Sequence, residues 1–405
     1  MKVLWHSNAP WAPTGYGQQT ALFAPRIRDL GHDVALSAFY GLEGATLEWD
    51  GMHVYPTDVS RFGRDLLHLW AAHHAAGGDV RDVQVIALMD SWCLTSPRLT
   101  DLRVAMWTPV DHAPTPPRVI EHFQLCRTTP IAMSRFGAEM LADEGLDPLY
   151  VPHGVDTSVF RPVDEHELIR REMRVEPDVF VVGMVANNQG TMPPRKAFPQ
   201  VFQAFARFVR EVDGDAVLYL HTDVAGMNMG LNLLALSERM GIPDRNLRAS
   251  DQLLYQLGYP AEGVARLYNG MDVLANPSYG EGFGIPIVEA QACGTPVIVS
   301  DWTAMPELCG AGWIVTGEPM YDPTQGSFYL WPSPDSLFEQ LCAAYEARSV
   351  RDELAAAAVA FAAGYDVELV MRDYWLPVLD QLEHGRVVPP LNREQRRAAA
   401  KGEKS

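Results

Sequence analysis

Short apolar runs alternate along the chain with longer segments in which apolar residues recur at helical spacing. This alternation is typical of βα units and predicts an α/β protein with parallel sheets. In the first part of the chain it predicts strands at 3–5, 34–38, 83–88, 104–107, 129–132 and 149–151, and helices at 18–30 and 135–144.

A second series of strands and helices begins near residue 179. Its patterns predict strands at 179–185, 216–221, 273–275 and 296–300, and helices at 198–211, 231–240 and 261–269. The chain then ends in helical patterns at 334–348, 351–363 and 367–382. The last of these carries Tyr374 and Trp375, whose large apolar side chains are expected to pack against an apolar surface elsewhere in the protein.

The polar, turn-rich stretch 153–167 separates the two series and is typical of an interdomain connection. A chain of 405 residues also exceeds what one hydrophobic core usually serves. We therefore expect an N-terminal domain over 1–155 and a C-terminal domain over 156–365. The helix at 366–384 is expected to pack back on the first domain, and 385–405 to form a flexible basic tail.

The composition narrows the choice of partners and of compartment. A formal net charge of −19 argues against nucleic acid and against anionic membranes, because both need clustered Lys and Arg. Five cysteines without a CxxC pair favour a reducing compartment. The sequence has neither a recognisable secretory signal nor an unbroken apolar run of about 18 residues. We therefore expect a cytoplasmic protein that does not insert into membranes.

The strongest chemical signal is the stretch EGFGIPIVE, which runs from Glu281 to Glu289 between two predicted strands. Pro286 suits the first turn of a helix, so a helix is predicted to begin near residue 285. Glu281 then lies in the loop after a strand, whereas Glu289 lies about one turn into the helix and leans back toward its start. Both carboxylates are thus expected near the same helix N-terminus.

This arrangement suits a sugar diphosphate. Glycines at Gly282 and Gly284 allow backbone N–H groups to approach phosphates closely, and carboxylates accept hydrogen bonds from sugar hydroxyls. The alternative is that the acids only complement the helix dipole, which is worth a few tenths of a kcal/mol. The two acids together with the glycines favour a binding site, to which Phe283 between the glycines is also assigned.

Arg195 and Lys196 follow the strand predicted at 179–185 and precede a helix. A leaving diphosphate needs positive charge at such a place, and supplying it is the main catalytic task where no metal is available. The alternative is a pair of solvated cations, for which the start of a helix is a slightly unfavourable position.

These residues resemble the retaining glycosyltransferases of family 4, whose fold is called GT-B: two Rossmann-like domains that face a central cleft. The likeness rests on Glu281 and Glu289 as an E-x7-E signature, on HGVDTSVFRP at 153–162, and on the Arg195–Lys196 pair. It implies that Glu281 contacts the donor sugar, Glu289 the ribose, and Arg195 with Lys196 the diphosphate. In the family the Arg and Lys are usually separated and glycine follows the lysine, whereas here they adjoin and Ala197 follows.

The predicted first domain offers two further segments. Gly15 and Gly17 lie between the first strand and its helix, where glycines let the backbone approach a donor or an acceptor. Asp111 and His112 follow the strand at 104–107, at the edge where open α/β sheets place ligands, and family members often carry His or Asp there. The sequence leaves open which of the two faces the donor sugar. Ser134 is expected to cap the helix that follows it.

The predicted function is therefore transfer of a sugar, with retention of configuration, from a nucleotide-sugar to a hydroxyl of a protein, glycan or small molecule. No cofactor and no metal are expected, since the nucleotide-sugar is a substrate. Three alternatives stay open: a metal-dependent transferase that uses Asp213 and Asp215 as a DxD motif, a nucleotide-sugar epimerase of similar shape, and a non-catalytic nucleotide-binding scaffold.

Overall fold

The computed structural model describes residues 1–57, 61–190, 194–212, 214–227 and 229–384. The chain forms two compact units. Unit 1 comprises Met1–Gly154, Asp322–Ser327 and the chain from Val367 onward, and unit 2 comprises Val155–Tyr321 and Phe328–Asp366. The basic tail predicted at 385–405 lies outside the described residues.

Unit 1 is built on an eight-stranded sheet with the order β3-β4-β2-β1-β5-β6-β7-β8. Neighbouring strands are parallel except β3 and β4, which are antiparallel. The central strand β1 is flanked by β2 and β5, with Leu4 opposite both Ala35 and Val85. The strands are β1 (Lys2–Asn8), β2 (Asp33–Tyr40), β3 (Leu47–Trp49), β4 (Met52–Tyr55), β5 (Val83–Leu88), β6 (Arg103–Thr108), β7 (Thr129–Ala132) and β8 (Leu149–Tyr150).

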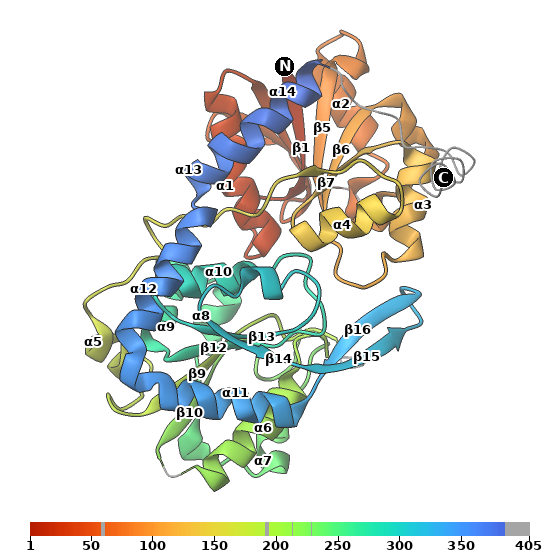
Figure 1. Ribbon diagram of the computed structural model, residues 1–405. Helices are drawn as coiled ribbons and strands as arrows, with labels where there is room; N and C mark the ends of the chain where they lie inside the picture. Colours follow the sequence, from red (N-terminus) through yellow and green to blue (C-terminus); the bar gives the residue numbers. More distant parts are fainter. Residues whose placement is uncertain (58–60, 191–193, 213, 228, 385–405) are drawn as a thin grey trace. The chain divides into compact units, whose positions relative to one another are not determined.

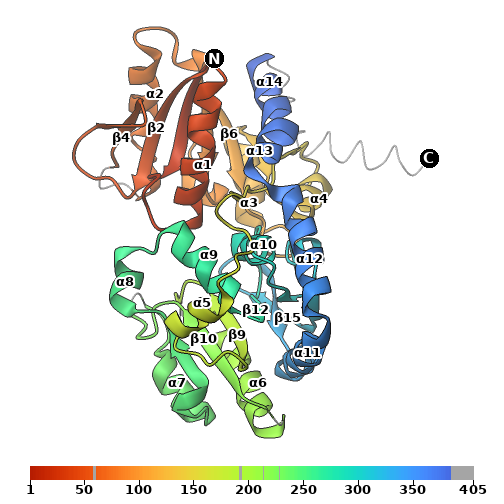
Figure 2. The same cartoon turned by 90° about the vertical axis from the view of Figure 1, so that its left-hand side faces the viewer.

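The segment 367–384 packs on α1 (Gly15–Asp29), the first helix of unit 1, so the two lie side by side (Figures 1 and 2). Trp375 is fully buried, with its ring 5.8 Å from Phe23 and 5.6 Å from Trp5. It lies in a π-helical segment, Met371–Trp375, which interrupts the continuous helix predicted at 367–382. The helices of this unit are α1 (Gly15–Asp29), α2 (Leu67–Ala75), α3 (Pro117–Cys126), α4 (Arg135–Asp143), α13 (Val367–Val370) and α14 (Leu376–His384).

Unit 2 is built on a six-stranded sheet with the order β11-β10-β9-β12-β13-β14, in which all neighbours are parallel. Helices α6 and α11 lie side by side (Figure 1) and bury Phe202, Phe205 and Leu337 in one apolar core. The strands are β9 (Phe180–Val185), β10 (Ala216–His221), β11 (Leu247–Ala249), β12 (Val273–Asn276), β13 (Val297–Ser300) and β14 (Gly312–Val315). The helices are α5 (His166–Glu172), α6 (Phe198–Glu211), α7 (Leu233–Met240), α8 (Gln252–Leu257), α9 (Ala261–Gly270), α10 (Ile285–Ala292), α11 (Pro334–Glu346) and α12 (Arg351–Ala362).

A two-stranded hairpin, β15 (Gly317–Asp322) and β16 (Ser327–Pro332), follows β14 and was not predicted. Its strands belong to unit 2 up to Tyr321 and from Phe328, and the loop between them is grouped with unit 1. Within the described parts of the chain, no helix is both long and apolar enough to span a bilayer.

Candidate functional site

The predicted donor-binding residues of unit 2 lie beyond the carboxyl ends of two adjacent strands. Arg195 and Lys196 end the loop that leads from β9 to α6, and Glu281 lies in the loop between β12 and α10. Strands β9 and β12 pair in parallel, with Leu274 opposite Gly183. Their carboxyl ends therefore meet at one edge of the sheet, which brings residues far apart in the sequence together.

The two cations converge on one carboxylate. The Lys196 ammonium forms a short ion pair with Oε1 of Glu281. Nη1 of Arg195 lies 3.9 Å from Oε2 of the same carboxylate and donates a hydrogen bond of 3.1 Å to the Gly280 carbonyl. The Arg195 side chain is 38% exposed and that of Lys196 19%, whereas that of Glu281 is only 8% exposed. The acid is thus covered and the cations reach solvent.

Glu281 is held as a carboxylate. Burial alone would raise the pKa of its carboxyl group, but the charges of Lys196 and Arg195, with the hydrogen bond from Lys196, bring the pKa below its ordinary value. Its backbone N–H donates to the hydroxyl of Thr303 at 3.0 Å, which fixes the loop. At neutral pH this side chain can accept hydrogen bonds from hydroxyl groups and cannot act as a general acid.

Helix α10 begins where it was predicted, with Pro286 in its first turn. Gly284 caps it with φ +113°, a conformation that L side chains rarely adopt, and a Cβ there would come within 2.8 Å of Ile287. No side chain caps this end of the helix. Phe283 is buried, with its ring 5.7 Å from that of Tyr365, and so serves packing of the loop.

The second glutamate of the signature, Glu289, lies inside α10 and is also buried. Oε2 of Glu289 accepts a 2.9 Å hydrogen bond from the hydroxyl of Tyr268, a residue of α9 that the sequence analysis did not single out. Burial and the charge of Glu289 raise the pKa of Tyr268 well above its ordinary value, so this hydroxyl stays a donor.

Ala197, which stands where the family usually has glycine, adopts the left-handed conformation at φ 55° and ψ 27°. Only glycine adopts this conformation without steric cost. The backbone at this position therefore has the form that glycine favours, although the residue is alanine. Ala197 lies between Lys196 and the first turn of α6.

In unit 1 the structure brings Asp111 and His112 into direct contact, since Nδ1 of His112 lies 2.7 Å from Oδ1 of Asp111. His112 is 1% exposed and its Nε2 lies 3.5 Å from Oδ2 of Asp322, the last residue of β15. Burial raises the pKa of Asp322, but hydrogen bonds from Thr324 and the facing His112 lower it overall. The sequence analysis missed Asp322, although the turn formers in 322–326 could have indicated a hairpin loop.

The glycine turn of unit 1 is shorter than predicted. Helix α1 begins at Gly15, so Gly15 and Gly17 form its first turn, and Thr14 caps it by accepting from the N–H of Gly17. A Cβ on Gly17 would lie 2.4 Å from the Ala12 carbonyl oxygen. Close packing against the chain's own backbone thus accounts for this glycine.

The start of α4 was also predicted. Ser134 caps α4 as predicted, by accepting a 3.0 Å hydrogen bond from Gly137 N–H.

Among the described residues, no group of three or more His, Cys, Asp and Glu side chains is placed to hold a metal ion. Asp213 of the DxD alternative lies outside the described residues.

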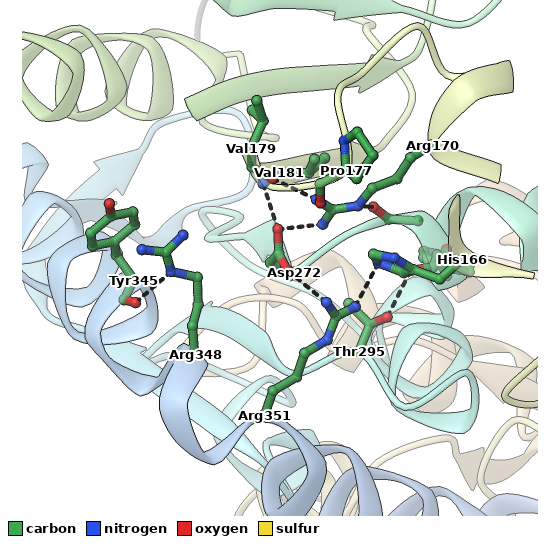
Figure 3. A network of polar contacts seen from close by, with 12 residues as sticks. His166, Arg170, Pro177, Val179, Val181, Asp272, Thr295, Tyr345, Arg348 and Arg351 are labelled. Carbon is green, nitrogen blue, oxygen red and sulfur yellow. Dashed lines mark hydrogen bonds and ion pairs between the residues drawn. The ribbon is translucent and has the colours of Figure 1, made fainter. Parts of the chain in front are cut away.

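A second charged cluster lies at the opposite, amino ends of β9 and β12 (Figure 3). Asp272, directly before β12, accepts 2.6 Å and 2.7 Å hydrogen bonds from Arg170 and from Val181 N–H, and pairs with Arg351 at 3.2 Å. Arg351 also contacts His166 at 2.8 Å. Sequence reasoning did not identify this cluster, because its members carry no motif.

Residues 176–345 match the family profile described as "Glycosyl transferases group 1". The match covers less than half of the chain. The matched stretch contains Arg195, Lys196, Glu281 and Glu289, so the cluster around Glu281 lies within it.

Sequence comparison also finds curated glycosyltransferases that are similar to part of this chain. A D-inositol 3-phosphate glycosyltransferase of Segniliparus rotundus is 31% identical over 157 residues, which are 38% of this chain and 32% of that protein. The enzyme of the same name from Actinosynnema mirum is 33% identical over 169 residues, 42% of this chain and 38% of that protein. The matched part thus spans about a third of the length of these relatives.

Solved structures share the fold over nearly the whole chain. A glycosyltransferase from Rickettsia africae superposes with a TM-score of 0.70 at 14% identity, covering 95% of this chain and 98% of that one. Sucrose-phosphate synthase from Thermosynechococcus elongatus gives 0.71 at 14% identity, with 94% and 99% covered. HepE of Anabaena, solved with UDP and glucose, gives 0.67 at 17% identity, with 94% and 100% covered. The predicted GT-B fold of two Rossmann-like domains is therefore confirmed.

Proposed function

We propose that the protein is a retaining glycosyltransferase that takes a sugar from a nucleotide-sugar donor. The observation that carries this proposal is the convergence of Lys196 and Arg195 on Glu281 beside the start of α10, inside the stretch that matches the group 1 profile. The site presents positive charge, backbone amides and one fixed carboxylate, which are the groups that a sugar diphosphate requires.

Each of these groups has a role in the proposed reaction. Arg195 and Lys196 bind the diphosphate and stabilise the charge that develops on it as the bond to the sugar breaks. Glu281, kept ionised by the same cations, accepts hydrogen bonds from the donor sugar. Glu289, oriented by Tyr268, accepts from the ribose hydroxyls. No metal is required for this charge stabilisation.

The acceptor is proposed to bind at unit 1, where Asp111 and His112 orient its hydroxyl. Asp111 bonds to Nδ1 of His112 and so fixes the imidazole ring. In a transfer with retention the acceptor oxygen bonds to the anomeric carbon on the face from which the diphosphate leaves, and a diphosphate oxygen takes its proton. This step needs positioning and charge stabilisation and no protein nucleophile.

The first donors to test follow from the relatives. HepE of Anabaena has been solved with UDP and with UDP-glucose. We therefore propose UDP-sugars as the first candidates, followed by GDP- and ADP-sugars.

The test is mass spectrometry of the full-length protein with each nucleotide-sugar, with and without candidate hydroxyl acceptors. A glycosyltransferase should release the nucleoside diphosphate slowly without acceptor and transfer the sugar with one. Interconversion of donor epimers without release would indicate the epimerase instead, and donor binding without any turnover would indicate a scaffold. Lys196→Ala should lose the release activity; release unchanged by this variant would contradict the proposed site.

A further inference from the structure

Tyr279 lies in the connection between β12 and α10, two residues before Glu281, and is fully buried. For a large aromatic side chain in a loop to be buried, another segment of the chain must pack over its ring. In unit 2 this segment is the hairpin β15–β16, which the sequence analysis did not predict (Figure 1). Tyr329 of β16 and Met320 of β15 pack with Tyr279 and with Ala197, the residue that follows Lys196.

Backbone hydrogen bonds join three segments through Tyr279. Its N–H donates to the Arg195 carbonyl at 2.8 Å, and its own carbonyl accepts from Leu330 N–H of β16 at 2.9 Å. One peptide segment thus links the hairpin on one side to the cation-bearing loop on the other. Gly280, the next residue, accepts the hydrogen bond from the Arg195 side chain.

Side-chain contacts hold the Tyr279 ring in one orientation. Its hydroxyl accepts a 2.6 Å hydrogen bond from Nε2 of Gln200, in the first turn of α6. The ring centroid lies 6.3 Å from that of Tyr329 and 5.2 Å from that of Trp331. Burial raises the pKa of Tyr279 to about 12, so the hydroxyl remains neutral at any physiological pH.

We propose that the hairpin β15–β16 fixes the donor-binding loop, with Tyr279 and Tyr329 as positioning residues for Arg195 and Lys196. This inference rests on the proposed function. Neither tyrosine contacts the donor in this account; they act through the cations. The physical reason is that side chains which bind a diphosphate must be held in the productive geometry, and a displacement of about 1 Å can cost up to about 100-fold in rate.

Strand β16 supplies a matched pair of variants. Tyr329 is 8% exposed and faces Tyr279 and Ala197, whereas the adjacent Phe328 is 37% exposed and packs against Tyr321 of the same hairpin. Tyr329→Ala therefore removes the contact with the site, and Phe328→Ala removes a ring of similar size from the same strand without touching the site.

The experiment is calorimetric titration of the full chain with UDP, GDP and ADP, using the nucleotide that the wild-type protein binds best. Tyr329→Ala should weaken binding about tenfold, Phe328→Ala less than twofold, and Tyr329→Phe should restore most of the affinity. Thermal unfolding of each variant shows whether it is folded at the temperature of the titration.

A background that lacks both cations separates positioning from general destabilisation. If Tyr329 acts through the cations, Tyr329→Ala should cost much less affinity in a protein that already carries both Arg195→Ala and Lys196→Ala. Equal losses for Tyr329→Ala and Phe328→Ala, or an undiminished loss in the protein that lacks both cations, would overturn the positioning role while the proposed function stands. Failure of the wild-type protein to bind any of these nucleotides would overturn both.

Discussion

Strands β9 and β12 of unit 2 have one acid and two cations beyond each of their ends. At the amino ends Asp272 pairs with Arg170 and Arg351, and at the carboxyl ends Glu281 pairs with Lys196 and Arg195. Both acids are largely buried. The two clusters therefore have similar charge and similar burial of the acid, on the same pair of strands.

They differ in what surrounds the cations. Arg170 is 2% exposed and donates to the backbone carbonyls of Gly270, Pro177 and Val179 as well as to Asp272. Arg195 is 38% exposed. A cation enclosed by carbonyl groups of its own chain stabilises the fold, whereas a cation at the surface can accept an anionic ligand. Arg351, the other cation at the amino ends, is 41% exposed, so the contrast is between Arg170 and Arg195. We assign a stabilising role to Arg170 and a binding role to Arg195.

Arg170→Ala tests the cluster around Asp272, here called the enclosed cluster, and should have the largest effect. It leaves Asp272 buried with less compensation, which should lower the free energy of unfolding by about 3–5 kcal/mol. Urea unfolding measures the change, and Arg372→Ala, which removes an exposed ion pair with Asp373, is the control with little expected effect. Turnover per folded molecule should not change. A loss below about 1 kcal/mol would remove the distinction between the clusters.

Lys196→Ala tests the cluster around Glu281, here called the open cluster. Loss of the ammonium that is proposed to neutralise the leaving diphosphate should lower turnover by about 100-fold or more. Lys196→Arg keeps the charge and should retain more activity. Steady-state kinetics on the donor found by the screen measures both variants. Near-normal turnover in Lys196→Ala would show that the leaving group is stabilised elsewhere.

Arg195→Ala is the direct counterpart of Arg170→Ala. Since this side chain is partly exposed and 3.9 Å from Glu281, its removal should change the free energy of unfolding by less than about 1 kcal/mol. Binding of the nucleoside diphosphate should weaken about tenfold, because one charge-assisted contact is lost. A large loss of stability with unchanged affinity would reverse the roles assigned to the two arginines.

The pH dependence of stability should arise mainly outside the open cluster. Burial lowers the pKa of His122 and His221 to about 4 and that of His153 to about 3. Between pH 6.5 and 4 the unfolded chain therefore binds more protons than the folded one, so the free energy of unfolding should fall as pH falls through this range. The pKa of the Glu281 carboxyl is lowered by Lys196 and Arg195, so this group stays ionised at neutral pH.

His153→Gln measures one part of that slope. This buried histidine packs with its ring 4.6 Å from Trp107, and its replacement should flatten the dependence by up to about 1 kcal/mol per pH unit. Urea unfolding at pH 7, 6 and 5 gives the slope for both proteins. An unchanged slope would show that His153 is not buried in its neutral form.

Much of the fold could be predicted because its main elements are strongly patterned. The helix at 198–211 and the strands at 83–88 and 216–221 have the bounds expected from their apolar spacing. The hairpin β15–β16 was missed, since it exposes aromatic residues such as Phe328 and Trp331, so no clear alternation of apolar and polar residues marks its strands.

The candidate site could be predicted residue by residue but not as an arrangement. The pattern around Glu281 gave the start of α10, because Pro286 and the glycines act locally. The ion pair between Glu281 and Lys196 joins residues 85 positions apart, and local patterns carry no information on such contacts. Asp322 and Tyr268 belong to no motif, so only packing of the folded chain reveals their partners.

The most direct test of the central claim is a crystal structure of the full chain with the nucleoside diphosphate that binds best. The account predicts phosphate oxygens within hydrogen-bonding distance of Lys196 Nζ and of the Arg195 guanidinium, next to the start of α10. A nucleotide whose phosphates lie beyond hydrogen-bonding distance of both side chains would contradict it.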